Sequence, residues 1–347
     1  MNSKPFFTVG VPVYNTSRWL DDTIKTIISQ DFTDFELIFC NDGSTDNSLD
    51  ILSKYAEQDN RIKIINRPNG GVSSARNAII SHACGEYIYF IDSDDLMCEK
   101  ALSTAASVLK QNNYPDVLET SYFMQDGEGK NKFKYTAAYP GDKYFDTSLT
   151  NDERATLMWL DSTYSVCVFA KFIRTEFLHK SGVVFPLQYT MGEDNDFVFQ
   201  LHRNTGRIAY ADFCPNIYIN PREGSIVSQM SVRSFYNSVK YTASLLDDVK
   251  LYNISDKFWE ENRSKYEHKV SDFYSERINY CLNLLHSNVA KDILWSKVDI
   301  VDNFLNKYRH SITDKNLLFS IIRFLGIKNT FKILYKYLRF KGVISDE

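Results

Sequence analysis

The sequence predicts an α/β protein in which helices cover both faces of a mostly parallel sheet, followed by an α-helical C-terminal region. Over the first hundred residues, apolar runs alternate with segments of helical periodicity. The runs are apolar throughout, which is typical of strands buried on both faces of a parallel sheet. From about residue 226 glycine becomes scarce and long stretches keep helical periodicity, which indicates a second domain made of helices.

Four strands are expected in the first hundred residues, at the apolar runs 6–13, 35–40, 61–65 and 86–91. A helix follows each strand. Ser17 is placed to cap the first helix, whose apolar face consists of Leu20, Ile24, Ile27 and Ile28. The second helix follows the turn at 41–48 and aligns Leu49, Leu52 and Ala56.

The third helix is expected over 73–85, where Gly85 would terminate it. The fourth follows the acidic run at 92–95, and its apolar face consists of Leu102, Ala105, Ala106 and Leu109. In open parallel sheets, ligands bind beyond the carboxyl ends of the strands. Polar loops follow three of those ends, at 14–15, 41–44 and 92–95. We therefore expect these loops to surround one binding site.

The composition limits the class of protein. A length of 347 residues suits one large domain and a smaller one, and we place the domains at 1–225 and 226–347. The net charge of −4 argues against nucleic-acid binding, because phosphate contacts draw on a basic excess. Six scattered cysteines without metal-ligand spacing favour a reduced, cytoplasmic protein. The sequence shows neither a signal-peptide pattern nor an apolar run of membrane-spanning length.

The first strand–helix loop contains no glycine, and this limits how a nucleotide could bind. Dinucleotide folds need G-x-G-x-x-G at that loop, and P-loops need G-x-x-x-x-G-K-[ST]. Neither pattern occurs in the chain, so the phosphates of a bound nucleotide need another source of positive charge. A divalent cation held by Asp92 and Asp94 would supply it, since hard cations take oxygen ligands and bridge phosphates. The alternative for 92–95 is a solvated acidic turn that caps the next helix.

Four segments, at 9–15, 41–48, 69–77 and 89–95, read VGVPVYN, NDGSTDNS, NGGVSSARN and YFIDSDD. In their order and spacing the chain resembles the family 2 glycosyltransferases, over roughly its first 225 residues. The resemblance implies the GT-A fold, a nucleotide-diphosphate sugar as donor, and inversion at the anomeric carbon. It also implies a divalent metal cofactor, Mn²⁺ or Mg²⁺.

The resemblance assigns roles to individual residues of these segments. The edge that binds the base would consist of Pro12, Val13, Tyr14 and Asn15. Asp42 would accept a hydrogen bond from the base ring, and Asp92 would contact the ribose. Asp94 would bind the metal, with Asp92 as a second ligand. Further donor contacts would come from Gly71, Arg76 and Ser93, with Arg76 near the diphosphate. A solvated helix residue is the alternative for Arg76.

The segment at 185–201 resembles the family's Glu-Asp-x-x-Phe motif, through Glu193, Asp194 and Phe197. An inverting transfer needs a base on the acceptor side, and Asp194 is our candidate, with Glu193 as the alternative. The loop at 220–226 resembles the family's closing loop, which implies that Arg222 reaches the diphosphate or the acceptor. Phe169 stands where the family often has tryptophan, so the acceptor pocket is expected to differ in shape.

The C-terminal stretch 315–341 carries seven Lys or Arg residues and no acid. One interpretation is a helix pair packed on its domain with a solvated basic face. The other is an amphipathic tail that associates with anionic lipid at the inner face of the cell membrane. Both stay open at this point.

We therefore expect an inverting, metal-dependent glycosyltransferase of the hexosyltransferase type. It would transfer a sugar from a UDP-sugar to a hydroxyl of a glycan or lipid-linked glycan during cell-surface polysaccharide synthesis. The alternatives are a polyprenyl-phosphate glycosyltransferase and a non-catalytic subunit that binds nucleotide sugars. The Glu193–Asp194 pair argues against the first, because a phosphate acceptor is already ionised and needs no base. Formation of a homo-oligomer stays open.

Overall fold

The computed structural model describes residues 4–340, except 127–131, 137–147, 164, 189–191, 220–234, 237–238, 242, 244–245, 247–251, 253, 286–290, 306–321 and 323–325. The chain forms two compact units, Met1–Gln229 and Met230–Glu347. The assignment of catalysis to the first part of the chain stays a prediction. Of the residues named above, Arg222 lies outside the described residues.

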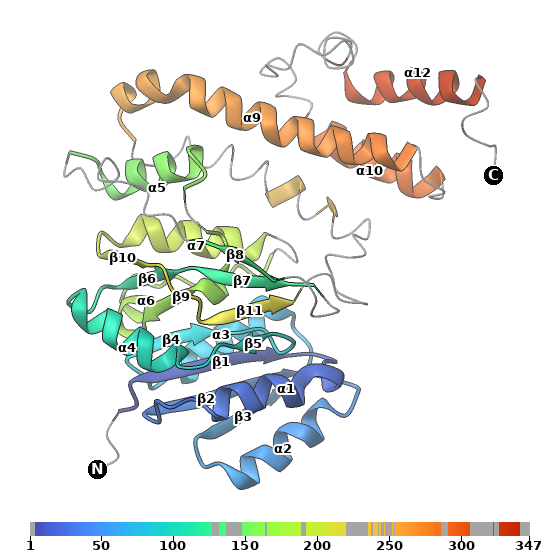
Figure 1. Cartoon of the computed structure of the whole chain (residues 1–347). Coiled ribbons are helices and arrows are strands. Elements are labelled where there is room, and N and C mark those ends of the chain that lie inside the picture. The colour runs from blue at the N-terminus through green and yellow to red at the C-terminus, as the bar shows by residue number, and fades with distance from the viewer. Residues whose placement is uncertain are drawn as a thin grey trace. The chain divides into compact units, whose positions relative to one another are not determined.

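The first unit is built on a sheet of seven described strands in the order β10-β6-β9-β4-β1-β2-β3 (Figure 1). β9 runs antiparallel to both β4 and β6, and the other neighbours are parallel. The bounds are β1 (Phe7–Val13), β2 (Phe35–Asp42), β3 (Ile62–Arg67), β4 (Tyr87–Phe90), β6 (Val117–Thr120), β9 (Lys171–Arg174) and β10 (Ile208–Ala211). The predicted mostly parallel sheet is therefore confirmed.

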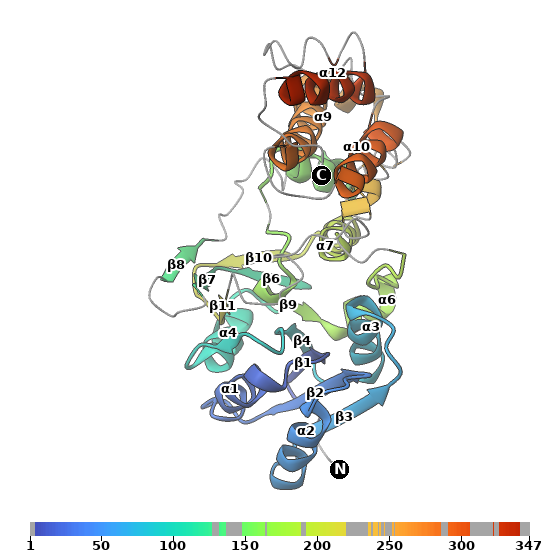
Figure 2. The same ribbon diagram turned by 90° about the vertical axis from the view of Figure 1, so that its right-hand side faces the viewer.

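Helices cover both faces of this sheet, as predicted. Figure 2 shows α1 and α4 on one side of the strands and α3 and α6 on the other. The bounds are α1 (Ser17–Ile28), α2 (Ser48–Gln58), α3 (Val72–His82), α4 (Ala101–Gln111), α5 (Asn151–Leu160), α6 (Thr175–Ser181) and α7 (Glu193–Asn204).

Alternate residues of the strands feed two separate cores. Leu37 and Phe39 of β2 belong to the core that also contains Ile24 of α1 and Leu102 of α4. Ile38, between them, packs in the core of the opposite face, with residues of α3, α6 and α7. Because successive strand side chains point to opposite faces, an apolar run without alternation is what this two-sided burial requires.

Two local expectations were wrong. The N-cap of α1 is Thr16, and Ser17 is the first helical residue; the N–H of Ser17 donates to Asp46 Oδ2 at 2.9 Å. A carboxylate from the neighbouring loop thus replaces the expected cap. Helix α3 ends at His82, before Gly85. Gly85 is needed for a different reason, since a Cβ there would lie 2.3 Å from the backbone nitrogen of Thr8.

A second, smaller sheet was not predicted. Its described strands follow the order β5-β11-β7-β8. The bounds are β5 (Leu96–Met97), β7 (Tyr122–Gln125), β8 (Lys132–Tyr135) and β11 (Asn216–Ile219). These strands have two to four residues each, which is too short for a periodicity that could be recognised in the sequence. β5 begins directly after the acidic run, so this sheet adjoins the predicted site.

The second unit is helical, as expected, with α9 (Asp256–Leu285), α10 (Lys291–Leu305) and α12 (Ile327–Phe340). The structure describes residues 322 and 326–340 of the basic stretch 315–341, and α12 contains most of these residues. Its residues Ile327 and Phe331 are fully buried, and the ring of Tyr335 lies 5.7 Å from that of Trp295 in α10. Part of its apolar face is therefore covered by protein. Within the described part of the chain, no helix combines the length and the apolar character that crossing a bilayer requires.

Candidate active site

The loops after β1 and β2 are joined by hydrogen bonds at the carboxyl edge of the large sheet. The N–H of Asn15 donates to Ser44 Oγ at 3.1 Å, and Asn15 Oδ1 accepts from the N–H of Thr45 at 2.8 Å. Asn15 has a φ of 53°, a left-handed conformation that asparagine tolerates better than most residues. Tyr14 is 50% exposed, whereas Val13 is 1% exposed. Side-chain contacts with a base are thus available from Tyr14 and Asn15, while Val13 serves the core.

Asp42 lies at the end of β2, where it holds the turn that leads into α3. It is 2% exposed, and its carboxylate accepts from the N–H groups of Gly70 and Gly71, at 3.0 Å and 2.7 Å to Oδ2. Arg67 Nε lies 3.4 Å from Asp42 Oδ1. Gly71 has a φ of 86°, which a residue with a side chain adopts only with strain. The carboxylate still has lone pairs for a base ring, so that role stays a prediction.

The acidic run at 92–95 is a turn whose four side chains differ in exposure. Ser93 and Asp95 are 4% and 0% exposed, while Asp92 and Asp94 are partly exposed. Asp95 Oδ1 accepts from the N–H of Ile219 in β11 at 3.0 Å. α4 begins only at Ala101, so the alternative that this run caps the next helix is wrong. Asp95 joins the acidic turn to the small sheet.

Arg76 brings the acidic turn and the Glu193–Asp194 pair together. It lies in α3 and is 4% exposed. Its Nη2 donates to Asp92 Oδ1 at 3.0 Å and its Nη1 to Asp194 Oδ1 at 2.5 Å. Nη1 also lies 3.9 Å from Glu193 Oε1. The solvated-helix alternative for Arg76 is therefore wrong.

An aromatic pair supports the guanidinium of Arg76. Its carbon Cζ lies 5.2 Å from the centre of the Phe185 ring. Phe185 stacks on Phe197, with ring centres 3.8 Å apart and an angle of 6° between the planes. Both rings are fully buried. The Phe of the Glu-Asp-x-x-Phe motif thus has a structural role, because it fixes the ring on which Arg76 rests.

The excess of negative charge changes the acid–base chemistry of the site. Asp194 follows Glu193 in the first turn of α7. Burial raises the pKa of Asp194, Arg76 lowers it, and Glu193 and Asp92 raise it again, giving a value of about 7. Burial lowers the pKa of Arg76, but the three carboxylates more than offset this and hold it above its usual range. A carboxyl that ionises near neutral pH suits a general base.

Aromatic rings from the small sheet lie beside the acidic turn. Phe169, in a short 3₁₀ helix (Val168–Ala170), stacks on Tyr218 with ring centres 5.2 Å apart. It also meets Tyr122 edge-on at 5.2 Å. Burial, followed by the charges of Asp95, Asp92 and other neighbours, raises the pKa of Tyr218 to about 12. No pattern in the sequence singles out Tyr122 and Tyr218, because the strands that carry them are so short.

A buried ion network holds the backbone that precedes Phe169. Lys171 Nζ donates to the carbonyl oxygens of Ser165 and Cys167, at 2.6 Å and 3.2 Å. It also lies 3.4 Å from Glu119 Oε1, which lies 2.8 Å from His202 Nε2. These three charged or titratable side chains are at most 2% exposed.

The residues present fit a divalent metal only in part. Among the described residues, no group of three or more His, Cys, Asp or Glu side chains is arranged to hold a metal ion. Mg²⁺, however, is usually held by one or two carboxylates together with substrate phosphates and water. Asp92 and Asp94 at the end of β4 match that smaller donor set. Metal binding by these two residues stays a prediction.

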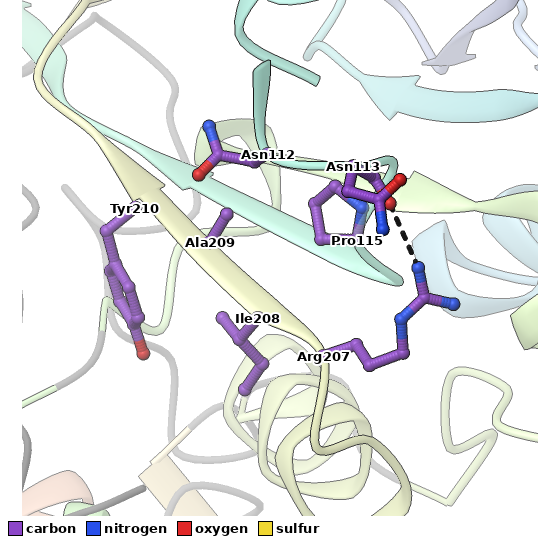
Figure 3. A pocket seen from close by; sticks show the side chains of 7 residues that line it. All are labelled: Asn112, Asn113, Pro115, Arg207, Ile208, Ala209 and Tyr210. Carbon is purple, nitrogen blue, oxygen red and sulfur yellow. Dashed lines mark hydrogen bonds between the residues drawn. The ribbon is translucent and has the colours of Figure 1, made fainter. Parts of the chain in front are cut away.

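One cavity lies away from these residues. It has a volume of about 380 Å³ and is lined by Asn112, Asn113, Pro115, Arg207, Ile208, Ala209 and Tyr210 (Figure 3). Pro115 precedes β6 and Arg207 precedes β10. The cavity is thus at the amino ends of the parallel strands, whereas Asp42 and Asp92 follow carboxyl ends. It does not belong to the candidate site.

Residues 8–182 match the family model described as Glycosyl transferase family 2. The chain belongs to this family. The match covers the segments at 9–15, 41–48, 69–77 and 89–95, on which the resemblance rests, but it does not test the role of any single residue.

Relatives of this glycosyl transferase family 2 chain include an enzyme of Staphylococcus aureus named poly(ribitol-phosphate) beta-N-acetylglucosaminyltransferase TarS. The two are 29% identical over 244 residues, which are 68% of this chain and 40% of TarS. The chain thus spans less than half the length of that relative.

Solved structures of low sequence identity share the fold. S. aureus TarS 1–349 in complex with UDP-GlcNAc superposes with a TM-score of 0.66 at 20% identity, covering 96% of this chain and 92% of that one. The mannosyltransferase PcManGT from Pyrobaculum calidifontis, in complex with GDP-Man and Mn²⁺, superposes with a TM-score of 0.50 at 14% identity, covering 98% and 81%. These superpositions confirm the predicted GT-A-type α/β fold with a helical region after it.

Proposed function

We propose that the chain is an inverting, metal-dependent glycosyltransferase that transfers a sugar from a UDP-sugar to a hydroxyl group. The observation that carries the proposal is the ionic cluster at the carboxyl edge of the sheet. Arg76 holds Asp92, from the donor motif, and Asp194, from the second motif, on its two terminal nitrogens. A base and a donor site brought together by one side chain are what a single-displacement transfer needs.

On the donor side, Asp94 and Asp92 would hold Mn²⁺ or Mg²⁺ against the diphosphate. The cation would offset the charge that develops on the leaving UDP. Tyr14 and Asn15 present their side chains at the edge expected to bind the base, and Asp42 is fixed by Gly70 and Gly71. TarS was solved with UDP-GlcNAc, and this supports uridine as the base.

On the acceptor side, Asp194 would take the proton of the attacking hydroxyl. The oxygen of the acceptor forms a bond to the anomeric carbon while the bond from that carbon to the diphosphate breaks. The proton passes to Asp194 Oδ, and the electron pair of the broken bond leaves with UDP. The pKa of about 7 leaves much of Asp194 ionised at neutral pH and keeps it basic enough to accept a proton.

A glycan is the acceptor that the surroundings favour. The rings of Phe169, Tyr218 and Tyr122 pack together beside the acidic turn. Tyr122 and Tyr218 are partly exposed, so each combines an apolar ring with a hydroxyl that could contact a sugar. TarS is named for a polymeric acceptor, in line with an acceptor from cell-surface polysaccharide synthesis. A polyprenyl-phosphate acceptor is less favoured, because its ionised phosphate would meet the carboxylates of Asp194 and Glu193.

Peripheral association with an anionic membrane stays part of the proposal for the cytoplasmic enzyme. α12 keeps Lys332 and Lys336 exposed, although Lys328 pairs with Asp299 at 2.7 Å and Phe331 is buried. Attraction by charge is therefore better supported than deep insertion of an apolar face.

The test is UDP release by the full chain from a panel of UDP-, GDP- and CDP-sugars, with Mn²⁺ and with a chelator. We expect slow release from at least one UDP-sugar through transfer to water, and loss of this release with the chelator. Release that is insensitive to the chelator would overturn metal dependence. Release from CDP- or GDP-sugars alone would overturn the assignment of uridine. A chain that binds UDP-sugars and releases no UDP, with any acceptor fraction, would be the non-catalytic subunit.

A further inference from the structure

The guanidinium of Arg76 is already occupied by carboxylates. Its two terminal nitrogens donate to Asp92 Oδ1 at 3.0 Å and to Asp194 Oδ1 at 2.5 Å. The side chain is 5% exposed, and its Nε is buried without a hydrogen-bond partner among the described residues. The guanidinium has further N–H groups, but its low exposure leaves little of it accessible to a diphosphate. The contact between Arg76 and the diphosphate that the resemblance implies stays a prediction, while the contacts of Arg76 in the structure are with carboxylates.

The geometry points instead to a positioning role: we propose that Arg76 fixes the carboxylate of Asp194 relative to Asp92, and so sets the base at a defined place beside the donor. This inference rests on the proposed function of Asp194. The two carboxylates belong to segments 102 positions apart (92 to 194), and no single helix or strand carries both. Arg76 is the side chain that bridges them, and the stacked pair Phe185–Phe197 supports it.

The shape of the arginine side chain matters as much as its charge. A guanidinium is a planar fork whose two terminal nitrogens can each hold a different carboxylate in a fixed direction. A lysine ammonium is a point charge on a flexible stem, so it can neutralise the cluster without fixing Asp194 relative to Asp92. Arg76→Lys therefore separates orientation from charge, whereas Arg76→Gln removes both.

The positive charge of Arg76 has a second, independent consequence, because it affects the pKa of Asp194. Among the described residues, the groups that face Asp194 are Arg76 from α3, Glu193 from its own helix, Asp92 from the acidic turn and the thiol of Cys167, whose pKa is raised mainly by burial and slightly by Asp194 itself. Only Arg76 among them is positive. Without it, protonation of Asp194 becomes easier, so its pKa should rise further by about one unit or more. Since the ionised form is the base, the acid limb of the activity profile should move to higher pH.

The experiment compares the full chain with Arg76→Lys, Arg76→Gln and a control, Arg61→Lys. Arg61 is matched because it also pairs with a carboxylate, Asp59, at 2.6 Å and lies 4.3 Å over the Phe35 ring. Its contacts are far from the carboxyl edge, since Phe35 opens β2 at the opposite end. Three quantities are measured: UDP affinity with Mn²⁺ by calorimetry, UDP release at saturating UDP-sugar over about pH 5 to 9, and the titration of Asp194 by ¹³C NMR, assigned with Asp194→Asn.

We expect Arg76→Lys to lower release at saturating donor by about tenfold or more while UDP affinity stays within about threefold. We expect Arg76→Gln to shift both the acid limb and the carboxyl titration of Asp194 upward, and Arg61→Lys to change neither. Weaker UDP binding with normal release at saturation would overturn the proposal and make Arg76 a diphosphate ligand. An unchanged titration of Asp194 in Arg76→Gln would also overturn it. A wild type that releases no UDP, with any acceptor fraction, would refute the proposed function, while the NMR titration would still decide the link between Arg76 and Asp194.

Discussion

Replacing Asp194 by asparagine removes the basicity of the carboxylate with almost no change of shape. The amide oxygen can still accept from Arg76 Nη1, which donates to Asp194 Oδ1 in the wild type, so the ionic cluster should stay assembled. If Asp194 takes the proton of the acceptor, turnover at saturating donor should fall by about 10²–10⁴-fold, the usual contribution of a general base. Affinity for UDP and metal should change little, because the proposed donor ligands Asp92 and Asp94 keep their carboxylates.

The pH dependence of the wild type gives the same carboxylate a second signature. With a pKa of about 7, Asp194 is half ionised near neutral pH, and only about 1% ionised two units lower. Turnover should therefore fall about tenfold per unit below that pKa. Asp194→Asn should lose this acid limb altogether, since no proton remains to titrate at that position.

Stability should respond in the opposite sense to activity. The pKa of Asp194 is raised from 3.8 to about 7 on folding, so the native state holds the proton more tightly than the unfolded chain. The stability from this group is complete below about pH 4 and is lost as the pH rises through about 7. The melting temperature of Asp194→Asn relative to wild type should therefore rise over that window. In the pH range in which Asp194 is ionised, it would lower the stability of the fold. Such a trade-off between stability and activity is common at active sites.

The assay is UDP release at saturating donor, with UDP binding by calorimetry as the control for donor affinity. Glu193→Gln is the matched variant: Glu193 lies 3.9 Å from the same nitrogen of Arg76 but is the weaker candidate, so its replacement should cost less. An Asp194→Asn enzyme within about threefold of wild type would refute the assignment, since ~0.7 kcal/mol is too small a loss for a base.

Three other outcomes test the donor site and the tail. Asp94→Ala should remove the gain in UDP affinity that Mn²⁺ gives over a chelator, and calorimetry that finds no such gain in wild type would contradict the metal assignment. UDP should displace the donor at least about tenfold better than CDP, since the carboxylate of Asp42 favours a ring that presents an N–H donor; equal competition would exclude this role. Binding to anionic vesicles should weaken steeply with salt and be lost in a chain ending at Asp314, at about 1 kcal/mol per basic residue; equal co-sedimentation of both chains would remove the membrane hypothesis.

Strands β1 to β4 and the helices that follow them could be predicted because their burial shows in short-range patterns, whereas β6, β9 and β10 of the same sheet were not predicted. Phe7, Val9 and Val11 fill one core, while Ile38 and Cys40 fill the other, so the apolar runs have no polar alternation. The small sheet could not be predicted, since its strands have two to four residues each. The start of α1 could not be predicted for a related reason: the N–H of Ser17 donates to Asp46, 29 residues away, and propensity near the helix end cannot reveal such a partner.

In the candidate site too, local sequence predicts some features, and others are seen only in the folded structure. The motifs place Asp92, Asp94 and Asp194 at strand and helix ends, which is enough to expect carboxylates around one ligand. The partners of those carboxylates are far away in sequence, as with Arg76 and Asp194, which are 118 residues apart. The sequence therefore suggests the diphosphate as the partner of Arg76, whereas its contacts in the structure are with Asp92 and Asp194.

The raised pKa of Asp194 and the proposed cation site in the acidic turn after β4 share one electrostatic cause, an excess of negative charge. Asp92, Glu193 and Asp194 lie around the single guanidinium of Arg76, so full ionisation of these four groups leaves two negative charges in excess. This excess adds to burial in disfavouring the ionised form of Asp194, which is why its pKa is about 7. The same excess favours a cation beside Asp92 and Asp94. If Asp194 is the base and a cation binds with the donor, donor binding and proton transfer would be coupled through this negative charge, which Arg76 partly neutralises.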